Sequence, residues 1–305
     1  PAGNPDMSPQ ADLSGRDLGQ DFSGLNGWSM YHGNPVPGFP AHPHRGFETV
    51  TVVEEGLVDH TDSEGAEARY GRGDTQWLTA GNGVSHCEMF PLVRTDEPNP
   101  LRLFQIWLNL APQDKKAPAH FTMMWADKTP LVTHTDDAGR TTRVKVVAGE
   151  FAGQTPPPPP PASWAARPEN HVAIWHAELD PGATLVLPAA DPAAVRTLYV
   201  YAGALGLGGH TLSDSGVVVD PTQDLAVTAG DLPTKFLLLQ GRPIGAPVAQ
   251  QGPFVGNSRE DLIEAFTDYQ NGVFGRWTHP SPGPVHERTQ GRFARYPDGT
   301  VHTPA

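Results

Sequence analysis

The sequence predicts an all-β protein built from short strands joined by tight turns. Glycine and proline each occur 33 times in 305 residues, and both disfavour the interior of long helices. Short β-branched and apolar segments recur at intervals of about 8–12 residues with turn residues between them, which is typical of sandwiches and barrels. A polar segment without periodicity, at 133–142, separates two such series, so we expect two β-domains.

The first series of strands follows a coil-like segment at 1–40. Its clearest member is 101–110, where Phe104, Ile106, Leu108 and Leu110 alternate with other residues and so share one face of a strand. The predicted strands of this half are 47–53, 57–60, 75–79 and 101–110.

The second series has a similar design. A Gly-Asp turn, Gly73-Asp74, precedes a strand in the first half, and Gly230-Asp231 precedes one in the second. This recurrence suggests a diverged duplication. The predicted strands of the second half are 144–148, 171–179, 183–187, 197–201, 216–219, 225–228 and 235–240.

One helix is predicted, at 258–270. Ser258 and Asp261 have the spacing of a capping box at its start. Its apolar stripe consists of Leu262, Ile263, Phe266 and Tyr269. We expect this helix to pack over a β-domain.

Six consecutive prolines occupy 156–161. They must adopt an extended polyproline II conformation, because proline lacks the amide hydrogen that a sheet requires. The segment is either a ligand for a partner protein or a stiff loop between strands, and we favour the loop.

Charge and composition exclude several classes of function. The net charge is −13, which disfavours direct binding of nucleic-acid phosphates. No apolar run approaches the length of a membrane span, and residues 1–12 lack the features of a secretory signal. Cys87 is the only cysteine, which rules out an internal disulfide and suits a reducing compartment. We therefore expect a cytoplasmic protein without membrane contact.

The motif that indicates chemistry is His42-Pro43-His44, followed later by His86-Cys87-Glu88. Residues i and i+2 of an extended chain face the same side. Two adjacent strands could therefore present three imidazoles and one carboxylate to a single metal ion, leaving open sites for substrate, water or O2. Pro43 fixes its own φ and would hold the pair of histidines extended. Isolated pairs of this kind are often only exposed histidines.

Longer strings around these residues resemble the pirin family of the cupin superfamily. They are HPHRGFETVT at 42–51, GDTQWLTAG at 73–81, HCEM at 86–89, GRP at 241–243 and QGPFVGN at 251–257. The likeness extends from about residue 21 to residue 277.

The resemblance implies an all-β fold of two stacked cupin (jelly-roll) β-barrels with a few short helices, including one near the C-terminus. It divides the chain into an N-terminal metal-binding cupin domain at 1–135 and a C-terminal cupin domain at 136–305 without metal ligands. It implies one divalent metal held by His42, His44, His86 and Glu88. Fe(II) is the favoured ion, with Mn, Ni, Co, Cu and Zn as alternatives.

The resemblance also implies a quercetin 2,3-dioxygenase-like activity on a small planar phenol with O2. In this hypothesis Glu88 is the catalytic group that takes the proton of the phenol, and Phe47 and Trp77 line the pocket. Glu48 occupies the usual cupin glutamate position, so it is either a rival ligand or a supporting group. Arg45 could pair with an acid or steer an anionic substrate. Cys87 should point away from the metal as a buried apolar residue.

The alternative is a protein without catalytic activity. Its metal would be structural or redox-sensing, and it would regulate a transcription factor or a metabolic enzyme through protein–protein contact. The two hypotheses differ in the pocket, because an enzyme needs an accessible cavity of roughly 300 Å³ or more beside the metal.

Overall fold

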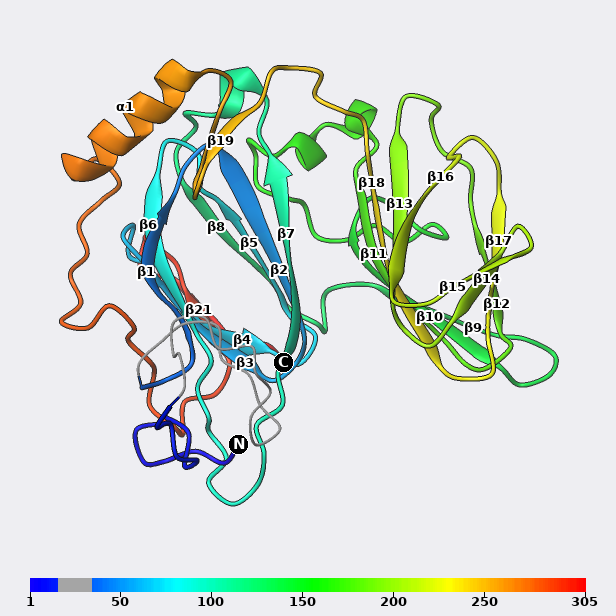
Figure 1. The fold of residues 1–305 in the computed structure, drawn as a ribbon, viewed down its shortest axis with the longest axis horizontal. Helices are drawn as coiled ribbons and strands as arrows, with labels where there is room; N and C mark the ends of the chain where they lie inside the picture. Colours follow the sequence, from blue (N-terminus) through cyan, green and yellow to red (C-terminus); the bar gives the residue numbers. More distant parts are fainter. Residues whose placement is uncertain (16–34) are drawn as a thin grey trace. The chain divides into compact units, whose positions relative to one another are not determined.

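The computed structural model describes residues 1–15 and 35–305. The chain forms two compact units (Figure 1): Pro1–Ala126 together with Ala246–Ala305 make unit 1, and Asp127–Gly245 make unit 2. These bounds differ from the boundary at 135/136 drawn from the sequence, because the last 60 residues return to unit 1. The return depends on pairing between strands far apart in sequence, for which no local pattern exists.

In the described residues, unit 1 contains two large antiparallel sheets and one short two-stranded hairpin. The strands of the larger sheet lie in the order β1 (Gly38–His44), β6 (Val84–Met89), β3 (Leu57–Asp62), β4 (Glu67–Gly71), β21 (Phe293–Arg295) and β22 (Val301–His302). Those of the other sheet lie in the order β7 (Arg102–Asn109), β2 (Phe47–Glu55), β5 (Thr75–Thr79) and β8 (His120–Met124). Both sheets contribute to one buried apolar cluster, which includes Val53, Tyr70, Leu78, Val84 and Phe121. The short 3-10 helix Pro112–Asp114 lies between β7 and β8.

Unit 2 repeats this design with its own two sheets. One has the order β16 (Ser215–Val219), β13 (Val195–Ala202), β18 (Thr234–Gly241), β11 (Ala173–Leu179), β10 (Thr141–Ala148) and β9 (Leu131–Thr135). The other has the order β12 (Thr184–Leu187), β17 (Leu225–Ala229), β14 (Leu205–Leu207) and β15 (His210–Leu212). The core is again shared between the sheets, with Trp175, Leu198 and Phe236 among its members. Two 3-10 helices, Trp164–Ala166 and Pro168–Asn170, precede β11.

The polar segment at 133–142 is not a seam between domains. It belongs to a hairpin in which β9 pairs with β10. The expectation was wrong because most side chains of β9 are exposed, and a strand without a buried face carries no alternating apolar pattern.

The predicted helix is present as α1 (Arg259–Gln270), beside the short hairpin of β19 (Ala249–Gln251) and β20 (Phe254–Gly256). Ser258 caps it, and the Ser258–Asp261 capping box is formed in both directions. The buried face carries Leu262 and Ala265, whereas Ile263 is 56% exposed, so the apolar stripe is narrower than predicted. Neither α1 nor any other helix of the described residues has the length and apolarity to cross a membrane.

Candidate metal centre

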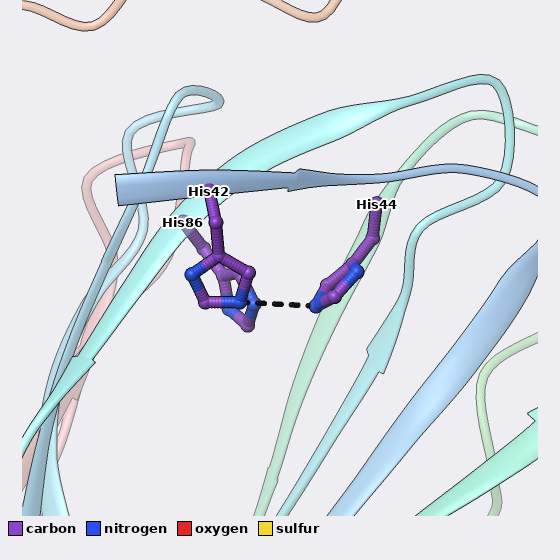
Figure 2. A group of neighbouring side chains, drawn as sticks. All are labelled: His42, His44 and His86. Atoms are coloured by element: carbon purple, nitrogen blue, oxygen red, sulfur yellow. Dashed lines mark hydrogen bonds between the residues drawn. The ribbon is translucent and has the colours of Figure 1, made fainter. Parts of the chain in front are cut away.

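Three histidines converge in unit 1. His42 and His44 lie on β1, and His86 lies on β6, where it is the direct cross-strand partner of His42. Figure 2 shows the three rings turned toward one another. Their centroids lie 4.5 to 4.8 Å apart. One nitrogen of each ring lies within 4.8 Å of the others. The pairing of β1 with β6 therefore brings the three imidazoles to one point, as predicted from the sequence motif.

The turn after β1 fixes the position of His44. Gly46 has a φ of +82°, and a Cβ added to it would lie 1.9 Å from the carbonyl oxygen of Val255. Its amide donates to Gly81 O over 2.8 Å, and its own carbonyl accepts from Lys115 Nζ over 2.8 Å. Pro43 lies on β1, an edge strand of its sheet, where a residue without an amide hydrogen is tolerated. The motif is thus held by its neighbours on both sides.

The protonation state of the three imidazoles is suited to binding a metal cation. His86 is fully buried, and neither of its ring nitrogens has a hydrogen-bond partner in the described structure. His42 Nδ1 lies 2.9 Å from Pro40 O, and because a carbonyl only accepts, this nitrogen carries the hydrogen and Nε2 keeps its lone pair. Burial, helped by the nearby His42, lowers the pKa of His44 and of His86 well below the usual value. Neutral imidazoles with available lone pairs are the form that metals bind.

Glu88 lies on the same face of β6 as His86, two residues further along. Its Oε1 accepts from Thr51 Oγ1 over 3.2 Å, and its Oε2 accepts from Gln105 Nε2 over 2.7 Å. These bonds orient the carboxylate at the wall of the cavity that His42 and His44 also line.

This cavity has a volume of about 450 Å³. Its walls are the aromatic rings of Phe39 and Trp107, two prolines and a set of polar side chains. The full lining is Phe39, Pro40, His42, His44, Glu88, Gln105, Trp107 and Pro253. Phe39, Gln105 and Trp107 were not predicted from the sequence as lining residues. The one available signal was the alternation in β7, which places Gln105 and Trp107 together on the face opposite Phe104 and Ile106.

The two predicted pocket aromatics have different positions. The ring of Phe47 lies 5.0 Å from that of His44 and 4.3 Å from that of Trp107, so it supports the site. Trp77 pairs with Val50 across β2 and β5. Paired residues share a face, and Val50 lies on the face of β2 opposite Phe47 and Thr51. Trp77 therefore does not line the cavity; Trp107 takes that place.

Glu48 lies on that opposite face as well. It pairs with Thr79 and accepts a hydrogen bond from Thr79 Oγ1 over 2.7 Å. Because Phe47 already points toward His44, its neighbour Glu48 points away from the three imidazoles. The structure thus brings together His42, His44 and His86 with Glu88 nearby, but not Glu48.

Arg45 and Cys87 are both turned away from the metal-binding face. Arg45 donates to Asp268 Oδ2 over 2.6 Å and to Asn82 Oδ1 over 2.8 Å, so it ties the turn after β1 to α1. Cys87 is buried among apolar residues, including Val36 and Met89. Burial raises the pKa of its thiol to about 12, so it behaves as the expected small apolar residue.

One buried neighbour of the histidines was not anticipated. His60 on β3 pairs with Glu88 on β6, and its ring lies 5.4 Å from that of His86. Its Nε2 lies 3.1 Å from Asp62 Oδ2. The available signal was the two-residue spacing between His60, the last residue of the predicted strand 57–60, and Asp62 just beyond it.

Comparisons with known proteins agree with this geometry. The sequence matches the family model Pirin over residues 16–108 and the model for the pirin C-terminal cupin domain over residues 174–275. A Caulobacter vibrioides protein named "Pirin-like protein" is 36% identical over 238 residues, which cover 78% of this chain and 80% of that one. A Pseudomonas aeruginosa protein named "Putative quercetin 2,3-dioxygenase" is 34% identical over 246 residues, with the same coverage.

A solved structure extends the likeness to three dimensions. The crystal structure of a quercetin 2,3-dioxygenase from Acinetobacter baumannii matches with a TM-score of 0.69 and 30% identity. The match covers 79% of this chain and 80% of that chain. The two β-units are accordingly two cupin domains, as expected from the sequence. With relatives this similar over most of their length, the chain belongs to the pirin family.

Proposed function

We propose that this protein is a metal-dependent dioxygenase that cleaves flavonols such as quercetin with O2. The observation that carries the proposal is the convergence of three imidazoles, two of which, His42 and His44, line a cavity of about 450 Å³. The names of the Pseudomonas and Acinetobacter relatives support the same class of reaction.

In this proposal His42, His44, His86 and Glu88 hold the ion. Nitrogen ligands with one carboxylate suit several first-row metals, and Fe(II) is our preferred candidate. When bound, the metal supplies Lewis acidity that lowers the pKa of a phenolic hydroxyl beside it.

The protein side chains would orient the phenol and accept its proton. Glu88 is the proposed acceptor, since Thr51 and Gln105 hold its carboxylate at the cavity wall. Phe39 and Trp107 offer flat apolar surfaces to a planar ring. Phe47 packs behind Trp107 and fixes its position.

The cavity favours the enzyme over the regulatory alternative. Its volume exceeds the roughly 300 Å³ that a small-molecule site needs. A metal-sensing protein that acts by docking a partner would be better served by a closed site, as in structural zinc centres.

The test uses the full chain purified and then loaded separately with Fe, Mn, Ni or Co. Oxygen uptake and the loss of flavonol absorbance should appear together with at least one metal. His42→Ala and His86→Ala should lose the metal, measured by elemental analysis, while circular dichroism shows a retained fold. His120→Ala, at an exposed histidine on β8, is the matched control and should keep the metal. The absence of turnover with all four metals would refute the activity, and unchanged metal content would refute the ligand set.

A further inference from the structure

Unit 2 contains a cavity of about 760 Å³. Its lining comes from one end of the unit's strands, including Ala148 at the end of β10, Ala173 at the start of β11 and Gln240 near the end of β18. It therefore opens at the mouth of the second barrel. Its volume lies within the range of small-molecule sites.

The proline run forms one wall of this cavity. Pro156–Pro159 line it, together with residues 165–168, where the first 3-10 helix ends and the second begins. Proline has a fixed φ, so this wall is rigid before any ligand arrives, which reduces the entropy cost of binding. Trp175 and several alanines complete an apolar lining.

The cavity lies at the counterpart of the metal-binding segment of unit 1. Leu187-Pro188-Ala189-Ala190 in unit 2 resembles Phe39-Pro40-Ala41-His42 in unit 1. Each segment lies the same distance ahead of a long strand, β13 from Val195 and β2 from Phe47. Ala190 thus stands where His42 stands, and it lines the cavity.

Arg196 supplies the polar anchor. Arg196 is only 1% exposed, and it lines the cavity. Nε donates to Gln240 Oε1 over 2.8 Å, and Nη1 donates to Pro188 O over 2.9 Å. Among the described residues, Nη2 has no hydrogen-bond partner and no carboxylate lies within 4.0 Å of the guanidinium. Buried charges are normally paired, so this position calls for an anion.

The surrounding charges limit what that anion can be. Arg167 is a second cation in the wall, but Glu150 and Asp191 also line the cavity. Asp191 lies 3.4 Å from His171 Nε2. Two carboxylates near the site disfavour a multiply charged ligand such as a phosphate. A single negative charge on an apolar body fits both the guanidinium and the lining.

We infer that this cavity binds a small organic monocarboxylate with an apolar, ring-sized body. The carboxylate accepts from the unused donors of Arg196, and the ring packs against Trp175 and the prolines. The site needs no metal and is separate from the centre on β1 and β6.

The experiment is calorimetric titration of the full chain with benzoate and with benzamide, its uncharged analogue of the same shape. Benzoate should bind with equal affinity before and after metal removal, and at least about tenfold more tightly than benzamide. A charge-assisted hydrogen bond accounts for a difference of that size. Equal binding of the two probes, no binding of benzoate, or loss of binding with the metal would overturn the inference.

Two variants test whether the ligand binds in this cavity. Arg196→Gln should weaken benzoate binding about tenfold or more, and Ala190→Phe should block it by filling the cavity while leaving Arg196 in place. If Arg196→Gln fails to fold by circular dichroism, Ala190→Phe decides. Arg143→Gln removes an exposed arginine of β10 that pairs with Asp180, and it should bind benzoate as the parent does. Unchanged affinity in a folded Arg196→Gln or in Ala190→Phe would refute the site.

Discussion

At the scale of single residues, the candidate metal centre is built from side chains that are held in place by burial and, for Glu88, by hydrogen bonds. His86 is enclosed, and neither of its ring nitrogens has a partner in the part of the chain that the structure describes. Glu88 is oriented by Thr51 and Gln105. Second-layer contacts of this kind orient metal ligands and tune their affinity. Gln105 lies in none of the sequence motifs, yet it makes the shorter of the two hydrogen bonds to Glu88.

Gln105→Leu should weaken metal binding, if Glu88 is a ligand as proposed, because one carboxylate oxygen loses its 2.7 Å donor. We expect a loss of about 10–100-fold in metal affinity, the usual cost of removing a supporting contact. Competition with a chelator measures it. Gln113→Leu is the matched control, since Gln113 is an exposed glutamine of the 3-10 helix Pro112–Asp114 and does not line the cavity. Equal affinities in parent and Gln105→Leu would contradict the role of Glu88.

The metal-free protein should lose stability as the pH falls below about 6.5. Burial holds the pKa of His44 and of His86 well below 6.5 in the folded state, so the unfolded chain binds more protons there. Each group then lowers the free energy of unfolding by up to about 1.4 kcal/mol per pH unit. Denaturant unfolding between pH 7.5 and 5.5 measures the slope. His86→Gln should have a shallower slope, and an identical slope would count against the assignment.

At the scale of elements, β1 carries the two histidines at an edge of its sheet, and its position depends on the turn that follows. The turn is held by Gly46, whose carbonyl and amide are both hydrogen-bonded, and by Arg45, which reaches Asp268 on α1. The helix near the C-terminus thereby supports a candidate metal site that lies more than 200 residues earlier in the sequence.

Gly46→Ala should destabilise the protein by more than about 2 kcal/mol. The positive φ alone costs about 1–2 kcal/mol, and the new methyl group would overlap the carbonyl of Val255. Gly65→Ala is matched in unit 1, because Gly65 also has a positive φ but nothing within 4 Å of its added Cβ; we expect about 1–2 kcal/mol there. Chemical denaturation compares the two, and equal losses would show that the Val255 contact is unimportant.

At the scale of the whole molecule, the last segment of the chain completes unit 1. β21 pairs with β4. Arg69, fully buried on β4, donates to both oxygens of Asp59 at 2.6 and 2.7 Å. The same guanidinium also donates to the carbonyls of His286, Glu287 and Gln290. The guanidinium of Arg69 therefore joins two early strands to a segment that lies more than 200 residues later in the sequence.

Arg69→Met should cost about 3–5 kcal/mol of stability, because it leaves the buried carboxylate of Asp59 without its partner. Arg295→Met is the control: its ion pair with Glu67, 3.0 Å long, is largely exposed and should contribute less than about 1 kcal/mol. Thermal and denaturant unfolding measure both. Similar losses in the two variants would show that the buried pair is not the anchor of this segment.

The sequence by itself determined the features that depend on local spacing. Local patterns placed several strands, among them β2, β3, β5 and β7, but missed others such as β4 and β8. Alternation put His42 with His44 and His86 with Glu88 on common faces, because side chains in a strand repeat every two residues. The cap of α1 could also be predicted from local spacing, because Ser258 and its partner Asp261 are three residues apart in the sequence. The long motifs identified the family.

Only the tertiary structure decided which faces meet. It placed Gln105 and Trp107 at the cavity and turned Trp77 and Glu48 away, through the register of β2 with β5 and β7. It also returned residues 246–305 to unit 1 and made the proline run a cavity wall. Register and strand order arise from packing between distant segments, and a one-residue shift exchanges the two faces of a strand, so local patterns do not contain them.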